Sequence, residues 1–134
     1  MTIQTDIAQA VKEAVAVALA LEEDEVTSDA AITADLGAES IDLLDVLFRI
    51  ERATGVKLEA ADLADYIQGG IPDEVFGDDD GKVSETGLAQ LKRAMPQIDE
   101  SALAGELEAE RVIDLFTVAN LVELVSQRGA VASA

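Results

Sequence analysis

The hydrophobic core of this chain has to be built almost without aromatic side chains. Phe, Tyr and Trp make up 3% of the 134 residues, and there is no Trp. Hydrophobic residues nevertheless account for 49% of the sequence, so the core must consist mainly of Leu, Val, Ile and Ala. This mixture favours packed helices over a β-sandwich. We therefore expect an all-α fold in a chain the size of one domain.

The charge of the chain is strongly one-sided. Its 9 Lys and Arg residues are outnumbered by 28 Asp and Glu residues, which gives a formal net charge of −19. Such a chain cannot replace the counterions of a phosphate backbone, so we expect no nucleic-acid partner. Its field attracts basic protein surfaces or simply keeps the chain in solution. The absence of Cys and His excludes disulfides, thiolate or histidine metal sites and histidine triads, and we expect no enzyme.

The N-terminal segment lacks the basic start and long apolar run of a signal peptide. The apolar stretch from Val11 to Leu21 is too short to span a membrane, and Lys12 and Glu13 interrupt it. We therefore expect a cytoplasmic monomer without stable membrane insertion.

Apolar residues at helical spacing predict two long helices in the first half of the chain. The first runs from an N-cap at Thr2 to about Leu21, and the second runs from Ser40 to just before Gly55. A long loop connects them, and loops of this length are uncommon unless they have a function. The loop is expected to be anchored by Val26, Ile32 and Leu36. The apolar face of the second helix is expected to comprise Ile41, Leu44, Leu47, Phe48 and Ile50.

Caps and helix breakers predict four further helices in the second half. They are a short helix over 59–67, a helix capped by Ser84 and stopped by Pro96, a helix from Asp99 to about Glu110, and a last helix capped by Thr117 and followed by Gly129.

The stretch from Asp35 to Asp42 places a glycine turn before a serine at a helix start. A serine there commonly caps the helix by accepting a backbone N–H. The same position also suits a phosphate group, because free N–H groups and the helix dipole point toward it. The residues alone leave both interpretations of Ser40 open.

Asp35-Leu36-Gly37-Ala38-Glu39-Ser40-Ile41-Asp42, continued to Leu58, resembles the attachment signature of acyl carrier proteins. In that family, Asp-Leu-Gly-x-Asp-Ser-Leu precedes an amphipathic acidic helix. Glu39 and Ile41 replace the usual Asp and Leu, and Arg49 and Arg52 add positive charge to a helix that is usually more purely acidic. The resemblance implies a single acyl-carrier-type four-helix bundle over 1–134, with a helical insertion at about 62–110 between the third and last helices.

The resemblance also implies a role for Ser40. A phosphopantetheinyl transferase would move 4'-phosphopantetheine from coenzyme A to its hydroxyl, and the thiol of that arm would carry an acyl group as a thioester. Ser40 would then be a modified residue and not a catalyst. The residues expected to contact basic docking surfaces on acyl synthases and acyltransferases are Glu39, Ile41, Asp42, Asp45 and Glu51. Ile41, Leu44 and Phe48 are expected near the arm. The simpler alternatives are a solvated helix face for the carboxylates and core packing for the apolar residues.

Part of the insertion, Gly81–Glu85 with Leu91-Lys92 and Ile98-Asp99, resembles the specialised carriers that supply very-long-chain acyl groups for lipid A in alpha-proteobacteria. This resemblance implies a role in fatty acid or lipid A biosynthesis. A polyketide or peptidyl carrier and an unmodified acidic helical adaptor remain alternatives.

The acidic turn at 78–81 would suit calcium only if it matched an EF-hand loop, but Phe76 and Gly87 occupy the first and twelfth ligand positions of such a loop, where neither can supply a carboxylate. We therefore expect no metal site.

Overall fold

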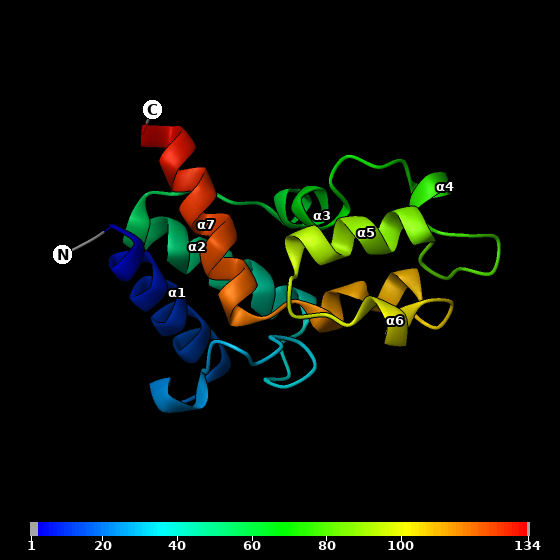
Figure 1. The fold of residues 1–134 in the computed structure, drawn as a ribbon. Helices are drawn as coiled ribbons and strands as arrows, with labels where there is room; N and C mark the ends of the chain where they lie inside the picture. Colours follow the sequence, from blue (N-terminus) through cyan, green and yellow to red (C-terminus); the bar gives the residue numbers. More distant parts are fainter. Residues whose placement is uncertain (1–2, 134) are drawn as a thin grey trace. The chain divides into compact units, whose positions relative to one another are not determined.

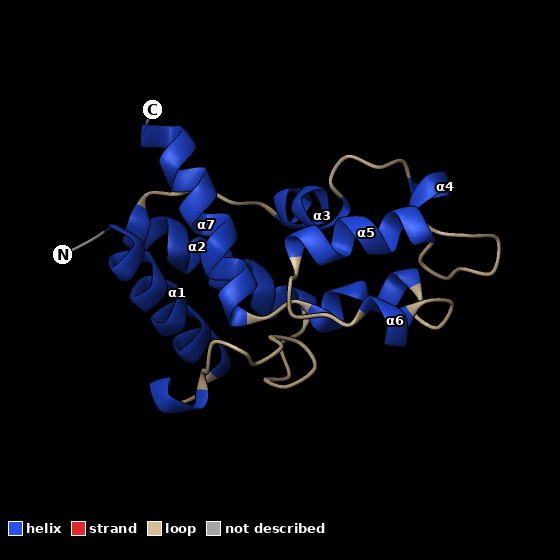
Figure 2. Cartoon of the chain, in the orientation of Figure 1, coloured by secondary structure: helices blue, strands red, loops and turns tan. Residues whose placement is uncertain are grey.

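A computed structural model describes the backbone of residues 3–133 and the side chains of residues 7–39 and 41–128. The expected all-α fold is confirmed: within these residues the chain forms helices and isolated β-bridges but no strand (Figure 2). The chain divides into two compact units. Residues up to Ala60 and from Phe116 onward form the first unit, and residues 61–115 form the second.

The first unit is built on three long helices, and α1 packs against both of the others (Figure 1). They are α1 (Ile3–Leu19), α2 (Ser40–Thr54) and α7 (Val118–Ser133). Aliphatic side chains with almost no exposed surface fill the space between them, as the composition predicted. The most deeply buried are Val11, Val15, Val46, Ile50, Leu121 and Val125.

The connection between α1 and α2 is long but well anchored. A short 3-10 helix, η1 (Glu23–Glu25), follows α1. Val26 and Ile32 are each 1% exposed, so these two predicted anchors are confirmed, whereas Leu36 is only half-buried. The N-cap predicted at Thr2 lies outside the described residues.

The second unit is a set of shorter helices. In chain order they are α3 (Ala60–Gln68), α4 (Asp73–Phe76), α5 (Glu85–Ala94), α6 (Glu100–Leu103) and the 3-10 helix η2 (Ala109–Leu115). α5 contacts both α4 and α6. The predicted cap of α5 is confirmed, because the Ser84 hydroxyl accepts the Gly87 N–H at 3.0 Å. One face of this helix and the residue after it are buried: Leu88, Leu91, Ala94 and Met95.

The helix predicted from Asp99 to about Glu110 is wrong. The only α-helix there is α6, and the chain then turns at Gly105, whose φ of +74° is unfavourable for other residues, before η2 begins at Ala109. Beyond the turn the backbone pairs with the 81–83 segment, since the Val83 N–H donates to Leu107 O at 2.8 Å and the Ala109 N–H to Gly81 O at 2.9 Å. These bonds to a distant segment replace the bonds that a continuous helix would make.

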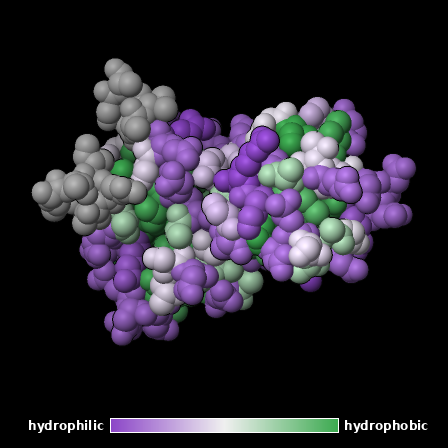
Figure 3. All heavy atoms as spheres, in the orientation of Figure 1, coloured by the Kyte–Doolittle hydropathy of each residue, from purple (hydrophilic) through white to green (hydrophobic). Residues whose placement is uncertain are grey.

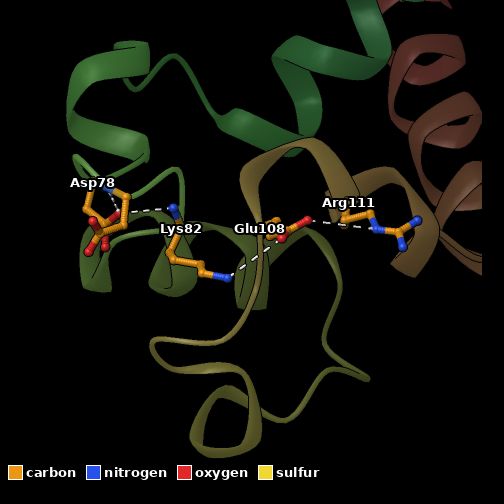
Figure 4. A network of polar contacts seen from close by, with 5 residues as sticks. Asp78, Lys82, Glu108 and Arg111 are labelled. Atoms are coloured by element: carbon orange, nitrogen blue, oxygen red, sulfur yellow. Dashed lines mark hydrogen bonds and ion pairs between the residues drawn. The ribbon is translucent and has the colours of Figure 1, made fainter.

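Side-chain contacts reinforce this pairing (Figure 4). Glu108 lies between Lys82 and Arg111, with N···O distances of 3.8 and 4.0 Å. The Asp78 carboxylate accepts the N–H groups of Asp80 and Lys82, each at 2.9 Å. The Asp78 side chain therefore stabilises the acidic turn by accepting backbone N–H groups from within that turn. In the described part of the chain, no group of three or more acidic side chains is arranged to hold a metal ion.

The start of α7 follows the prediction but its end does not. The Thr117 hydroxyl accepts the Asn120 N–H at 3.2 Å, and the Asn120 side-chain oxygen accepts the Thr117 N–H at 2.9 Å. This reciprocal cap is buried. Gly129 does not end the helix, which continues to Ser133.

Hydrophilic residues cover most of the face drawn in Figure 3, and hydrophobic residues show between them in small patches. None of the described helices is both long enough and apolar enough to cross a membrane.

Candidate functional site

The loop that precedes Ser40 is held by backbone bonds to the segment that leads into α7. The Ile32 N–H donates to Phe116 O at 3.0 Å, and the Val118 N–H donates to Ala30 O at 3.0 Å. The chain then folds back on itself, because the Ala38 N–H donates to Ile32 O at 3.1 Å. The loop therefore reaches α2 in one defined path, although it contains no long helix or strand.

The start of α2 differs from the cap interpretation of Ser40. Glu39 is the N-cap, and Ser40 is the first helical residue. Glu39 and Asp42 form a reciprocal capping box, in which the Asp42 carboxylate accepts the Glu39 N–H at 2.9 Å. Capping is thus assigned to two carboxylates, and the serine lies in the first turn of a 15-residue helix. The Ser40 side chain itself lies outside the described residues.

The other end of α2 is where the sequence predicted it. Gly55 follows the last helical residue with φ of +79°, and its N–H donates to Glu51 O at 2.8 Å.

The orientation of α2 corrects the predicted apolar face. Val46, Leu47 and Ile50 point into the core, each no more than 2% exposed. The other apolar residues of that face point outward instead. They are Ile41, which is 72% exposed, Leu44, which is 53% exposed, and Phe48, which is 56% exposed. The alternative prediction that these three side chains pack in the core is therefore wrong. They form most of the exposed large hydrophobic surface in the described part of the chain.

The acidic residues expected at a docking surface are spread over α2 and are partly committed to internal contacts. Glu39 is exposed, and Asp42, Asp45 and Glu51 are half-buried. The Asp45 carboxylate pairs with the Arg49 guanidinium at 3.2 Å. The Arg52 guanidinium carbon lies 5.6 Å from the centre of the Phe48 ring, a cation–π arrangement. The spacing of Asp45 and Arg49 predicts their ion pair, whereas the contact between Arg52 and Phe48 was not predicted.

A separate depression of about 790 Å³ lies at the end of α1. Its lining consists of Glu13, Ala16, Val17, Leu21, Glu22, Glu23 and Asp24. The four carboxylates are all exposed, and the lining residue nearest to Ser40 in the sequence is Asp24, in η1. We assign no ligand to it.

Comparison with known proteins identifies the family. A family model described as a phosphopantetheine attachment site matches residues 9–67. An acyl carrier protein of Thermotoga maritima is 38% identical over 63 residues, which cover 47% of this chain and 78% of that protein. An acyl carrier protein of Petrotoga mobilis is 40% identical over 58 residues, which cover 43% of this chain and 68% of that protein. The chain belongs to the acyl carrier protein family.

Membership of this family confirms several expectations. Acyl carrier proteins are carriers and not enzymes, and their cofactor is a covalently attached 4'-phosphopantetheine. The family interacts with phosphopantetheinyl transferases and with enzymes that handle acyl groups. No solved structure matches the chain.

Proposed function

We propose that this carrier bears its phosphopantetheine arm on Ser40 and carries acyl groups as thioesters on the thiol of that arm. The observation that carries the proposal is the position of Ser40 as the first residue of α2, directly after an anchored loop and within the matched region. A helix start is favourable for a phosphodiester because backbone N–H groups and the helix dipole both stabilise negative charge there.

Loading with a phosphopantetheinyl transferase and coenzyme A tests the site. We expect intact-mass spectrometry to show the addition of one phosphopantetheine group to the wild-type chain and none to Ser40→Ala. Ser28→Ala is a matched control, because Ser28 is an exposed serine in the same connection, and it should be loaded like the wild type. Addition to Ser40→Ala would assign the arm to another residue. No addition to the wild type would favour an unmodified acidic adaptor.

We further propose that the cargo is a very-long-chain acyl group for lipid A, within lipid biosynthesis in the cytoplasm. Two features support this proposal. The segment from Gly81 to Glu85 resembles that subclass of carriers, and residues 61–115 form a compact unit, most of which lies beyond the matched residues 9–67. We regard that unit as an insertion within one acyl carrier domain, and the carrier as a monomer.

The mass of the naturally loaded protein tests the cargo. We expect an acyl chain longer than those of ordinary membrane lipids. Chains of ordinary length would instead indicate general fatty acid synthesis, and a polyketide or aminoacyl adduct would indicate one of the alternative carrier classes.

We also propose that Glu39, Ile41, Asp42, Asp45 and Glu51 contribute to docking of acyl synthases and acyltransferases. Their place on or beside α2, close in sequence to Ser40, supports this role. An enzyme whose docking surface carries basic residues should bind these carboxylates, and the association should weaken as salt rises.

A further inference from the structure

The outward face of α2 carries an ordered series of side chains that begins beside the proposed attachment site. Ile41, Asp45, Phe48 and Arg52 are spaced by four, three and four residues, so they follow one line along the helix. At about 1.5 Å per residue, this line is about 16 Å long. With increasing distance from Ser40, the side chains along this line are apolar, acidic, apolar and basic.

The charge changes sign along this line. The first part of the helix region contains only acidic charges, at Glu39, Asp42 and Asp45. Beyond them, Arg49, Arg52 and Lys57 are all exposed. Three of the nine basic residues of a chain with net charge −19 therefore lie within nine consecutive positions. Glu51, which is half-buried, is the one acidic residue among them.

The internal contacts of the two arginines leave them available to a partner. The Arg49–Asp45 pair lies at the surface, with 43% and 41% of the two side chains accessible to solvent, and a pair of this kind contributes at most about 1 kcal/mol. Arg52 lies over the exposed Phe48 ring, so a protein that covers Phe48 also meets a guanidinium. A uniformly basic groove along α2 would place like charges together at this point, which disfavours the complex.

We propose that the docking partner of this carrier has a mixed surface: an apolar pocket for Ile41, Leu44 and Phe48, basic groups toward the Ser40 end, and at least one carboxylate facing Arg49 and Arg52. A carboxylate suits this position because it can accept two parallel N–H bonds from a guanidinium. The arginines then select partners, since they reject the wholly basic grooves that fit a purely acidic helix. This inference rests on the proposal that the arm is attached to Ser40.

A phosphopantetheinyl transferase with a basic docking groove serves as the probe, with coenzyme A as the donor. We expect Arg49→Glu and Arg52→Glu each to raise kcat/KM for loading by about five- to tenfold and to steepen its salt dependence, because each removes one repulsive contact and adds an attractive one. Arg93→Glu, an exposed residue of α5, makes the same change in net charge and should have little effect. Equal loading of all four proteins, or slower loading of the α2 variants, would overturn the proposal.

A charge swap on the probe completes the test. Basic residues of the transferase groove are replaced by Glu one at a time. At the position that faces Arg52, the replacement should speed loading of the wild-type carrier and slow loading of Arg52→Glu. If every replacement slows both carriers alike, the mixed surface is refuted while attachment at Ser40 stands. If no carrier is loaded by any form of the transferase, attachment at Ser40 fails and the inference fails with it.

Discussion

Replacement of Gly87 by Ala tests the packing of the second unit, because two effects of known size oppose each other there. Gly87 lies within α5 and is buried. Alanine is the better helix former by about 1 kcal/mol, so propensity alone predicts a more stable protein. A Cβ at this position, however, would lie 2.5 Å from Phe76 O and 2.7 Å from Val83 Cγ1.

The steric effect should exceed the gain in propensity. Phe76 O is a backbone atom that also accepts the Ser84 N–H at 2.8 Å, so it cannot recede without loss of that bond. Overpacking of this kind costs about 1–3 kcal/mol, and rigid backbone on one side favours the upper part of that range. We therefore expect Gly87→Ala to lower the free energy of unfolding by about 1–2 kcal/mol.

Urea denaturation followed by Tyr66 fluorescence measures this change. Tyr66 is the one tyrosine of a chain without tryptophan, and it lies on α3, so it reports on the second unit. Ala89→Gly, at an exposed position of the same helix, calibrates propensity and should lower stability by about 1 kcal/mol. If Gly87→Ala instead raises the free energy of unfolding by about 1 kcal/mol, as propensity alone predicts, α5 does not approach Phe76 as closely as the structure indicates.

Three other measurements test the fold and its charge. Ile50→Ala should lower the free energy of unfolding by about 2–5 kcal/mol because it opens a cavity at a fully buried position, whereas Leu44→Ala on the outward face should change it by about 0.5 kcal/mol or less. The pKa of Asp99 should lie below its ordinary value of 3.8, because Ser101 and the Ala102 N–H donate to the carboxylate. Its contribution to stability is then complete above pH 3.8 and is lost as the pH falls through the lower folded pKa, and Ser101→Ala should raise that pKa in an NMR titration. Added salt should raise the melting temperature, because the net charge of −19 is self-repelling; a melting temperature independent of ionic strength would show that the charges are already compensated.

The structural features that the sequence predicted correctly are mostly local ones. Ser84 and Thr117 were recognised as caps, and Gly55 was recognised as the residue after α2, because each acts within one helical turn of its own position. The attachment motif around Ser40 is local in the same sense, so the family could be inferred before the fold. The helix expected from Asp99 to about Glu110 was wrong because its backbone bonds to residues 81–83, which are distant in sequence.

What the sequence alone determined is that α2 runs from Ser40 to Thr54, that it begins after a glycine turn, and that the chain carries a large negative charge. It could not determine which side of α2 faces outward, because apolar residues occur on both sides of the helix. Packing against α1 buries Val46, Leu47 and Ile50, and this choice leaves Ile41, Leu44 and Phe48 exposed. Only the tertiary structure therefore decided that Ile41, Leu44 and Phe48 form an exposed surface of α2. The helix itself places Arg52 over the Phe48 ring, and the packing against α1 leaves that pair facing outward.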